Sequence, residues 1–277
     1  MDLDMFAHPS TQHNLDILRS YGNHIIEPAS GELASHLVGK GRMEEPEKIV
    51  EVLEEFFARQ QDLAGRKIVI TAGPTYEKID PVRFIGNYSS GKMGYALAEA
   101  CAARGAEVTL VSGPVTLHTV HPHIHRIDVE SAAEMHQAAA EAFKEADAGI
   151  LCAAVADFTP EQVAAQKIKR EKDDLVLRLK PTCDIAASLG KEKRPGQVLV
   201  GFALETCDEV SHAQDKLARK NFDFIVLNSL NDKGAGFRCD TNKITIIDRS
   251  EAVSYPLKSK KEVAEDIVDK LSSLFHS

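Results

Sequence analysis

The stretch KIVITAGPTYEKIDPVRFIGNYSSGKMG, residues 67–94, decides the fold. It begins with a β-branched run at residues 68–71, which has the composition of a buried strand. Gly73 and Pro74 then predict a turn, because glycine permits close backbone approach and proline fixes φ. After a polar loop, residues 93–103 predict an apolar helix. A strand, a glycine-containing loop and a helix N-terminus in this order are how an α/β sheet presents backbone N–H groups to a phosphate.

Two short nucleotide-binding patterns occur inside this stretch, and both are incomplete. Residues 86–92 read G-x-x-x-x-G-K, but Met93 stands where a P-loop has the Ser or Thr that holds Mg²⁺. Residues 88–92 read Y-x-x-x-K, the pair of short-chain dehydrogenases, yet the turn after Ile70 lacks G-x-G-x-x-G. We therefore expect neither a P-loop nor a nicotinamide site.

Further along the chain, strand and helix patterns alternate. Strands are predicted at 107–112, 124–129, 148–154, 174–179, 197–203 and 222–227, and helices at 131–145, 209–221 and 259–275. Such alternation predicts an α/β fold, a doubly wound, Rossmann-like, mostly parallel sheet with helices on both faces. A C-terminal hairpin is expected at 243–248 and 252–256, after a glycine-rich flap at 230–242.

The first 65 residues form a separate part of the sequence. Amphipathic helices are predicted at 14–21 and 45–57, joined by a glycine-punctuated loop. So short a segment with little apolar surface would make a poor core alone. The sequence therefore predicts a helical appendage at 1–65 and a main domain at 66–277.

The composition excludes several classes of protein. The chain has 277 residues with a net charge of −9, whereas a nucleic-acid binder would show a basic excess. No run approaches the ~20 apolar residues of a membrane span. The acidic N-terminus is unlike a signal peptide, and the five scattered cysteines form no C-x-x-C pair. We expect a cytoplasmic protein with reduced thiols and neither nucleic-acid nor membrane partners.

The chain from about residue 67 to the C-terminus contains the blocks ITAGPT (70–75), DPVRFIGN (80–87), SSGKMG (89–94), AAVADF (153–158), KIK (167–169), GFALET (201–206), KLARKNFDFIVLN (216–228) and GAGF (234–237). With these blocks it closely resembles phosphopantothenoylcysteine synthetase, the phosphopantothenate–cysteine ligase of coenzyme A biosynthesis. So many blocks in one order are far more specific than any single motif.

The N-terminal part resembles the end of the flavin-dependent phosphopantothenoylcysteine decarboxylase, which bacteria commonly fuse ahead of the synthetase. The matches are residues 1–5, 11–14 and 39–43. Asp2 stands where that family usually has Asn, and Ser35 where many members carry a reactive Cys. The chain looks like the C-terminal portion of a bifunctional enzyme. We expect no decarboxylase activity, and FMN only if the missing half of the decarboxylase is present.

The resemblance implies a reaction that joins 4'-phosphopantothenate to L-cysteine. In bacterial members the carboxylate attacks the α-phosphate of CTP, giving an acyl-cytidylate and pyrophosphate, and the cysteine amine then expels CMP. It also implies Mg²⁺, and a homodimer with the sites near its interface. Residue types alone do not distinguish CTP from ATP.

Residue roles carry over by position. The resemblance implies Asn87 and Lys167 as catalytic residues and Arg83 with Asn87 as substrate ligands. Nucleotide ligands would be Gly73, Pro74, Thr75, Ser89, Ser90, Gly91, Ala153, Ala154, Val155, Asp157, Lys167, Cys183, Asp184, Ile185, Ala186, Phe202, Lys216 and Lys220. Metal ligands stay unknown.

Each of these residues also has a structural interpretation. Asp157 follows a predicted central strand, where open sheets bind ligands, but could cap a turn. Phe202 could be core, and Lys216 and Lys220 a solvated helix face. Arg83 could form a structural ion pair. The histidines at 118, 121, 123 and 125 could suggest zinc, although their alternation suits a strand entry.

Two other functions stay open from the sequence. A Rossmann-type nicotinamide oxidoreductase is disfavoured by the absent G-x-G-x-x-G, and an absorbance change at the nicotinamide wavelength would support it. A non-catalytic assembly module derived from a flavoprotein would release no pyrophosphate from any nucleotide. Pyrophosphate release from CTP that depends on 4'-phosphopantothenate distinguishes all three.

Overall fold

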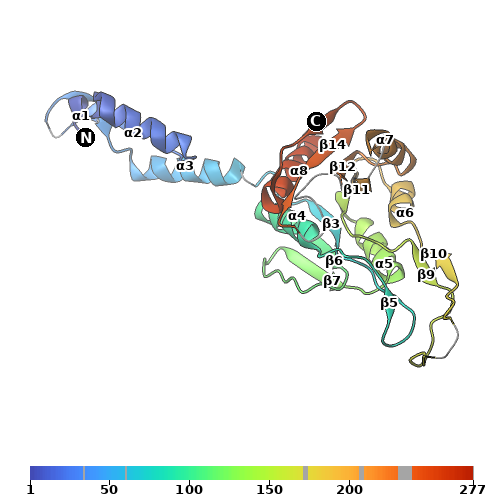
Figure 1. Cartoon of the computed structure of the whole chain (residues 1–277). Helices are drawn as coiled ribbons and strands as arrows, with labels where there is room; N and C mark the ends of the chain where they lie inside the picture. The colour runs from blue at the N-terminus through green and yellow to red at the C-terminus, as the bar shows by residue number, and fades with distance from the viewer. Residues whose placement is uncertain (34, 60, 171–173, 206–208, 230–238, 277) are drawn as a thin grey trace. The chain divides into compact units, whose positions relative to one another are not determined.

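The computed structural model describes residues 1–33, 35–59, 61–170, 174–205, 209–229 and 239–276. It divides into two compact units, residues 1–61 and 62–277 (Figure 1). Within the described residues, no helix is both long enough and apolar enough to cross a membrane. Most of the expected flap lies outside the described residues.

The first unit holds helices α1 (Leu3–Ala7), α2 (Pro9–Ser20) and α3 (Pro46–Arg59). The helix expected at 14–21 begins earlier, because Pro9 occupies the first turn, where its missing N–H costs nothing. The expected loop between the helices is wrong in part, since it contains an antiparallel pair, β1 (Ala29–Glu32) and β2 (Val38–Arg42). Glycines in both strands hid this pair, because they are poor strand formers.

The second unit is built on an eight-stranded sheet of order β15-β14-β12-β11-β8-β3-β6-β7. Its parallel strands are β3 (Lys67–Ala72), β6 (Glu107–Ser112), β7 (Ile124–Asp128), β8 (Ala148–Leu151), β11 (Val198–Glu205) and β12 (Phe224–Ser229). Taken in chain order they follow the 3-2-1-4-5-6 arrangement of the Rossmann fold. The hairpin β14 (Ile244–Asp248) and β15 (Ala252–Ser254) extends the sheet antiparallel. The predicted fold class and C-terminal hairpin are confirmed.

Helices cover both faces of this sheet, as predicted (Figure 1). One apolar core contains residues of α4 (Lys92–Ala103) and α8 (Lys260–Phe275) packed on the sheet. The other contains residues of α5 (Ala132–Phe143), α6 (Ile185–Glu192) and α7 (Glu209–Arg219). Ser131 caps α5 in a capping box with Glu134, as the sequence predicts.

The strand predicted at 174–179 is wrong. Residues 174–178 have no strand structure, and β10 (Leu179–Pro181) pairs instead with β9 (Phe158–Pro160), outside the main sheet. The alternating pattern misled because its apolar residues are exposed: Leu175 is 53% and Val176 81% exposed. Alternation predicts a strand only where one face is covered.

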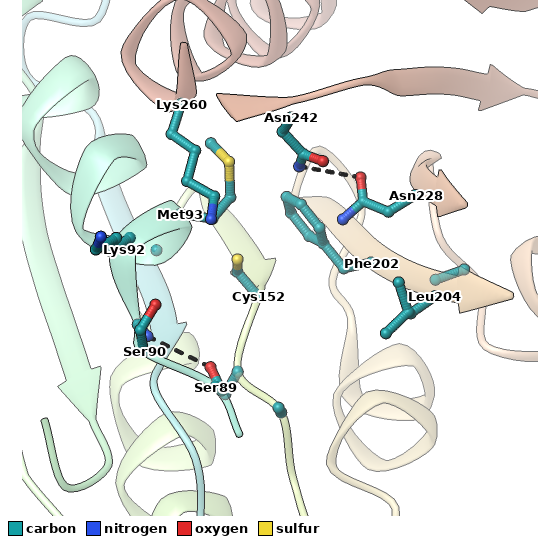
Figure 2. A pocket seen from close by; sticks show the side chains of 15 residues that line it. Ser89, Ser90, Lys92, Met93, Cys152, Phe202, Leu204, Asn228, Asn242 and Lys260 are labelled. Carbon is teal, nitrogen blue, oxygen red and sulfur yellow. Dashed lines mark hydrogen bonds between the residues drawn. The ribbon is translucent and has the colours of Figure 1, made fainter. Parts of the chain in front are cut away.

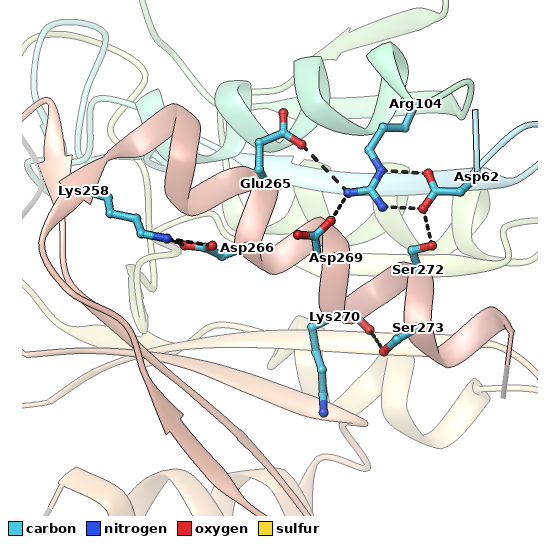
Figure 3. Close-up of polar contacts among 9 residues, drawn as sticks. All are labelled: Asp62, Arg104, Lys258, Glu265, Asp266, Asp269, Lys270, Ser272 and Ser273. Atoms are coloured by element: carbon cyan, nitrogen blue, oxygen red, sulfur yellow. Dashed lines mark hydrogen bonds and ion pairs between the residues drawn. The ribbon is translucent and has the colours of Figure 1, made fainter. Parts of the chain in front are cut away.

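A cluster of charged side chains fastens the start of the second unit to its last helix (Figure 3). Arg104, directly after α4, donates to Asp62 Oδ1 at 2.8 Å and to Asp269 at 2.6 Å. Ser272 Oγ donates to Asp62 Oδ2 at 2.5 Å. The Arg104 side chain is 16% exposed, so these charges interact in a partly desolvated setting and are screened less than surface pairs.

Candidate functional site

The site lies where the strand order of the sheet reverses. From β3 the chain continues to β6 and β7 on one side, and from β8 to β11 and β12 on the other. The carboxyl ends of β3 and β8 are therefore neighbours, and the chain continues from them toward opposite edges of the sheet. In open α/β sheets ligands bind in the crevice at this point.

The two loops are joined by backbone and hydroxyl contacts. Thr75 N–H donates to the Ala154 carbonyl at 3.2 Å, and Ala154 N–H donates to the Gly73 carbonyl at 2.9 Å. Thr75 Oγ1 accepts from Ala156 N–H at 2.9 Å. Gly73, Pro74 and Thr75 are buried and line neither pocket described below. In this structure the three residues join the loop after β3 to the loop after β8. Pro74 has no N–H group that could donate to a phosphate.

Pocket A lies above the start of α4, with a volume of about 160 Å³ (Figure 2). It is lined by residues 89–94, 152–154 and 202–204 together with Asn228, Asn242 and Lys260. It contains the predicted nucleotide ligands Ser89, Ser90, Gly91, Ala153, Ala154 and Phe202. Gly91 has φ of 75°, which glycine adopts without strain, and this turns the chain into α4.

Pocket B has a volume of about 280 Å³ and lies beside the start of α6. Its lining includes the predicted nucleotide ligands Ala153, Val155, Asp157, Cys183, Asp184, Ile185, Ala186, Phe202, Lys216 and Lys220. Residues from four separate blocks of the sequence are brought together here. The two lysines face the pocket from α7 and the residue after it, so they are not merely a solvated helix face.

Pockets A and B share two lining residues, Ala153 and Phe202. Ala153 follows β8, and Phe202 belongs to the neighbouring strand β11. The Phe202 side chain packs partly against the core and also lines both pockets, so the core interpretation holds in part and the contact with a base stays a prediction. Fourteen of the eighteen predicted nucleotide ligands are thus divided over two adjoining pockets, whereas Gly73, Pro74, Thr75 and Lys167 line neither.

Asn87 lines neither pocket but is bonded to Ala154, the residue after Ala153 of the shared wall. Its Nδ2 donates to the Ala154 carbonyl at 2.5 Å, and its Oδ1 accepts from Ser89 N–H at 3.0 Å. Both ends of the amide are therefore fixed by backbone groups. This geometry needs an amide, because a carboxylate could not donate to the carbonyl.

Lys167 and Arg83 are connected to each other through the residue after Lys167. Arg83 pairs with the buried Asp80, with Nε 2.9 Å from Oδ2, and also donates to the Ile168 carbonyl at 2.8 Å. Ile168 N–H donates to Asp80 at 3.1 Å. The structural ion pair left open for Arg83 is therefore present. Lys167 itself is exposed and, like Arg83, lines neither pocket.

The charges of pocket B are partly paired. Lys220 Nζ lies 3.0 Å from Asp184 Oδ1, and Asp184 also caps α6 by accepting from Ala187 N–H. Partial burial alone would raise the pKa of Asp184, but the Ala187 hydrogen bond and the Lys220 ammonium outweigh it and hold the pKa below its usual value. The pocket therefore keeps its carboxylate ionised next to an ammonium group.

Pocket A also contains Lys260 and Cys152, which no motif in the sequence indicates. Lys260, at the start of α8, is 8% exposed and donates to the Cys239 carbonyl at 2.5 Å. Burial lowers the pKa of Lys260 and raises the pKa of the Cys152 thiol to about 12. Cys152 therefore remains a neutral thiol near neutral pH. It should be unreactive, because the thiolate is the nucleophilic form.

Asn228 and Asn242 were also missed. Asn228 directly follows the predicted run 222–227, so its place at the carboxyl end of a parallel strand was a usable signal. Asn242 and Lys260 are far from any motif in sequence, and only the fold brings them to the pocket. No group of three or more metal-ligating His, Cys, Asp or Glu side chains is found in the described part of the chain.

Comparisons with known proteins identify the family of each unit. The family model "DNA/pantothenate metabolism flavoprotein C-terminal domain" matches residues 63–274, and the model "Flavoprotein" matches residues 1–58. The crystal structure of the C-terminal domain of the coenzyme A biosynthesis bifunctional protein CoaBC superposes with a TM-score of 0.67 at 41% identity, covering 78% of this chain and 98% of that one.

Two curated relatives align over nearly the whole chain. CoaBC of Bacillus subtilis is 46% identical over 99% of this chain and 68% of its own length. A protein from an unknown prokaryotic organism, named cysteine/cysteine sulfinic acid decarboxylase, is 60% identical over 100% of this chain and 78% of its own. The chain therefore belongs to the DNA/pantothenate metabolism flavoprotein family, and its second unit is the phosphopantothenoylcysteine synthetase part of that family's bifunctional enzymes.

Proposed function

We propose that the second unit joins 4'-phosphopantothenate to L-cysteine through an acyl-cytidylate, consuming CTP and releasing pyrophosphate and CMP. The observation that carries this proposal is the pair of adjoining pockets that share Ala153 and Phe202. A reaction between a nucleotide and a carboxylic acid needs two ligands held side by side, with their reacting atoms about 3 Å apart. Two pockets with a common wall at the switch point meet that requirement.

The two reactants are both anionic, so positive charge must offset their repulsion. Lys216 and Lys220 line pocket B, and Lys260 and the start of α4 provide charge and N–H dipoles at pocket A. Ammonium groups on flexible stems suit a triphosphate whose position changes during reaction. The proposed nucleotide ligands are those that line these two pockets.

Two further residues have proposed roles outside the pockets. Asn87, fixed by Ala154 and Ser89, would hold the acyl-nucleotide through hydrogen bonds at the shared wall. Lys167 lies in a segment anchored at Ile168 to Asp80 and Arg83. We propose that this segment brings the Lys167 ammonium to the phosphates when the nucleotide is bound, and that Arg83 acts by anchoring it.

In the proposed reaction, Mg²⁺ would be bound mainly by the phosphates of the nucleotide. Mg²⁺ is usually bound by one or two carboxylates plus substrate phosphates. Asp157, exposed at the edge of pocket B, is the carboxylate with that position, whereas Asp184 is engaged by Lys220. When bound, the ion would supply charge neutralisation to the phosphates.

The first unit is proposed to be the C-terminal part of a flavin-dependent decarboxylase domain. The flavoprotein model matches residues 1–58, close to the end of this unit at residue 61. We also propose that the enzyme acts as a homodimer, since exposed apolar side chains gather on the segments around β5 (Phe84–Ile85) and β9: Val82, Phe84, Tyr88 and Phe158. Such exposed apolar groups are typical of contact surfaces.

The test is pyrophosphate release from CTP by the purified chain. Release that requires 4'-phosphopantothenate, followed by cysteine-dependent formation of CMP and amide product, is expected. Release without 4'-phosphopantothenate, or none at all with saturating substrates and Mg²⁺, would contradict the proposal. ATP and UTP in parallel reactions measure the choice of nucleotide.

A decarboxylase is the second candidate, because the relative with 60% identity is named for that activity. It would release CO₂ from cysteine or cysteine sulfinic acid without any nucleotide. Both pockets described above are in the synthetase unit, which favours ligation. Nucleotide-independent CO₂ release with no pyrophosphate would reverse this preference.

A further inference from the structure

The loop after β8, residues 153–157, is fastened by two threonine hydroxyls. Thr75 is fully buried in the loop after β3, and its Oγ1 accepts from Ala156 N–H at 2.9 Å. Thr182, directly after β10, donates from its Oγ1 to the Ala156 carbonyl at 2.7 Å. Ala156 is therefore bonded at its N–H and at its carbonyl by side chains from two distant parts of the sequence.

Thr182 makes a second bond to the same loop through its backbone. Its N–H donates to the Asp157 carbonyl at 2.9 Å, which extends the β9–β10 pairing by one residue. The Ala156 and Asp157 carbonyls lie in the two peptide planes that flank the Asp157 Cα. Because peptide units are planar, fixing both planes fixes φ and ψ of the residue between them. Two bonds from Thr182 therefore hold the backbone of Asp157 in one conformation.

The Asp157 side chain depends on this backbone for its direction. Asp157 is exposed and lines pocket B together with Thr182. Among the residues that the structure describes, none forms a hydrogen bond or an ion pair with the Asp157 carboxylate. A ligand group that is already held in place loses less conformational freedom on binding. Thr182 is thus placed to preorganise a carboxylate that has no side-chain restraint of its own.

We propose that Thr182 is a positioning residue for nucleotide binding in pocket B: its hydroxyl and N–H hold the backbone of Asp157 so that the carboxylate faces the pocket before the nucleotide arrives. No motif of the sequence indicates Thr182. The inference rests on the proposed function for the presence of a nucleotide. It goes beyond that function by assigning part of the affinity for CTP to a residue that acts through another.

The test is Thr182→Val, which keeps the shape and the backbone N–H but removes the hydroxyl. The Kd for CTP, measured by calorimetry, should rise about five- to tenfold, the effect of one lost hydrogen bond. Thr182→Ser keeps the hydroxyl and should bind CTP as wild type does. Thr182→Ala removes the same hydroxyl with less bulk and takes the place of Thr182→Val if that variant does not fold.

Thr11→Val is the matched control. Thr11 Oγ1 also donates to a backbone carbonyl at 2.7 Å, that of Met5, but in the first unit. Its loss should leave the Kd for CTP unchanged. An equal Kd for wild type and Thr182→Val overturns the inference.

A double-mutant cycle separates positioning of Asp157 from a general structural role. If Thr182 acts through Asp157, Thr182→Val should cause no further loss of CTP affinity in a protein that already carries Asp157→Ala. The double variant should then bind CTP as weakly as Asp157→Ala alone. Additive losses would show that the hydroxyl supports the fold without acting through this carboxylate, and would overturn the inference.

Hydrogen exchange of the ligand-free protein tests the contact itself. In Thr182→Val the amides of residues 156 and 182 should exchange about tenfold faster than in wild type, because the bonds that close this segment are weakened. Peptide mass spectrometry over residues 153–158 and 179–184 measures these rates. Peptides of α5 and the Thr182→Ser variant should keep their wild-type rates. Unchanged exchange over residues 153–158 in Thr182→Val overturns the inference.

The outcomes distinguish this inference from the proposed function. If no pyrophosphate is released but CTP still binds, the proposed reaction fails and the Kd values still decide the role of Thr182. If wild type binds no CTP, both fail. If CTP binds to wild type and to Thr182→Val equally, only the inference fails.

Discussion

Asn87 Nδ2 and the Ala154 carbonyl oxygen are 2.5 Å apart, which ties the segment before α4 to the loop after β8. The bond joins the two sides of the sheet's switch point at the wall between the pockets. An amide at position 87 is therefore part of the frame of the site, bonded to two residues that line pocket A. A substitution at position 87 should therefore disturb the reaction without removing any side chain that lines the pockets.

Asn87→Asp should stop amide formation while CTP still binds. The carboxylate cannot donate to the Ala154 carbonyl and would repel both it and an incoming carboxylate. We expect turnover to fall about 10²-fold or more, with the Kd for CTP changed less than about threefold. Calorimetry measures the binding and chromatography the amide product.

Asn23→Asp is the matched control, because Asn23 Nδ2 also donates to a backbone carbonyl, that of Leu18 at 3.1 Å, but in the first unit. It should leave turnover unchanged. Wild-type turnover in Asn87→Asp would remove this residue from the mechanism.

Lys220→Gln should weaken the binding of CTP. The substitution removes one positive charge from pocket B and leaves Asp184 facing the triphosphate without its partner. We expect the KM for CTP to rise about tenfold, an effect of the size of one charged hydrogen bond. Lys191→Gln changes an exposed lysine of α6 that does not line pocket B and should have no effect. Equal KM values for the two variants would exclude Lys220 from the site.

Cys183 should react with iodoacetamide at pH 8, and CTP should slow the reaction. Cys183 is exposed and lines pocket B, so a bound nucleotide would cover it. Burial raises the pKa values of Cys152 and Cys101 to about 12, so both should stay unmodified and serve as internal references. Peptide mass spectrometry follows each site. A Cys183 rate that CTP does not alter would mean that nucleotide binds elsewhere.

Arg104→Met should destabilise the second unit by about 2–4 kcal/mol, because it leaves Asp62 partly buried without its cation. Urea unfolding measures the change in free energy. Lys144→Met is the control: the Lys144–Glu141 pair is exposed, and its loss should cost less than about 1 kcal/mol. Equal effects of the two substitutions would show that the Arg104 cluster (Figure 3) adds nothing to stability.

Stability should fall at acid pH through the same cluster. The hydrogen bond from Arg104 holds the pKa of Asp62 below its usual value. A group with a lowered folded-state pKa stabilises the protein above its unfolded pKa, about 3.9 for Asp, and this contribution is lost as pH falls further. Urea unfolding at pH 7, 5, 4 and 3 should show a shallower loss below pH 4 in Arg104→Met than in wild type. Parallel curves would contradict the assignment.

Much of the fold could be predicted because buried strands leave a strong pattern. β3 and β8 are continuous apolar runs covered on both faces, and no other environment suits them. β1 and β2 contain glycines, and all three residues of β10 are exposed. The hydrophobic pattern of these segments therefore does not indicate a strand. Those elements depend on pairing partners that only the folded chain provides.

The site could be predicted in part because some of its residues directly follow strands that the sequence pattern reveals. Residues that follow parallel strands, such as Asp157 and Phe202, meet at one edge of the sheet, and the resemblance identified their blocks. Asn242 and Lys260 come from β13 (Thr241–Asn242) and α8, after the parallel strands have ended. They come together because β13 pairs with β16 (Lys258–Ser259) across the C-terminal hairpin, a pairing that sequence spacing does not reveal.

The contact between Ser272 and Asp62 has a consequence for rearranging the polypeptide. The side chain of Asp62, at the start of the second unit, is within hydrogen-bonding distance of Ser272 in its final helix. A short flexible linker could therefore join these ends, and new termini could be opened at Gly196, whose positive φ marks an exposed turn between α6 and β11. Such a circular permutant should keep both pockets intact and would allow a reporter domain to be attached at the edge of the sheet opposite the two pockets.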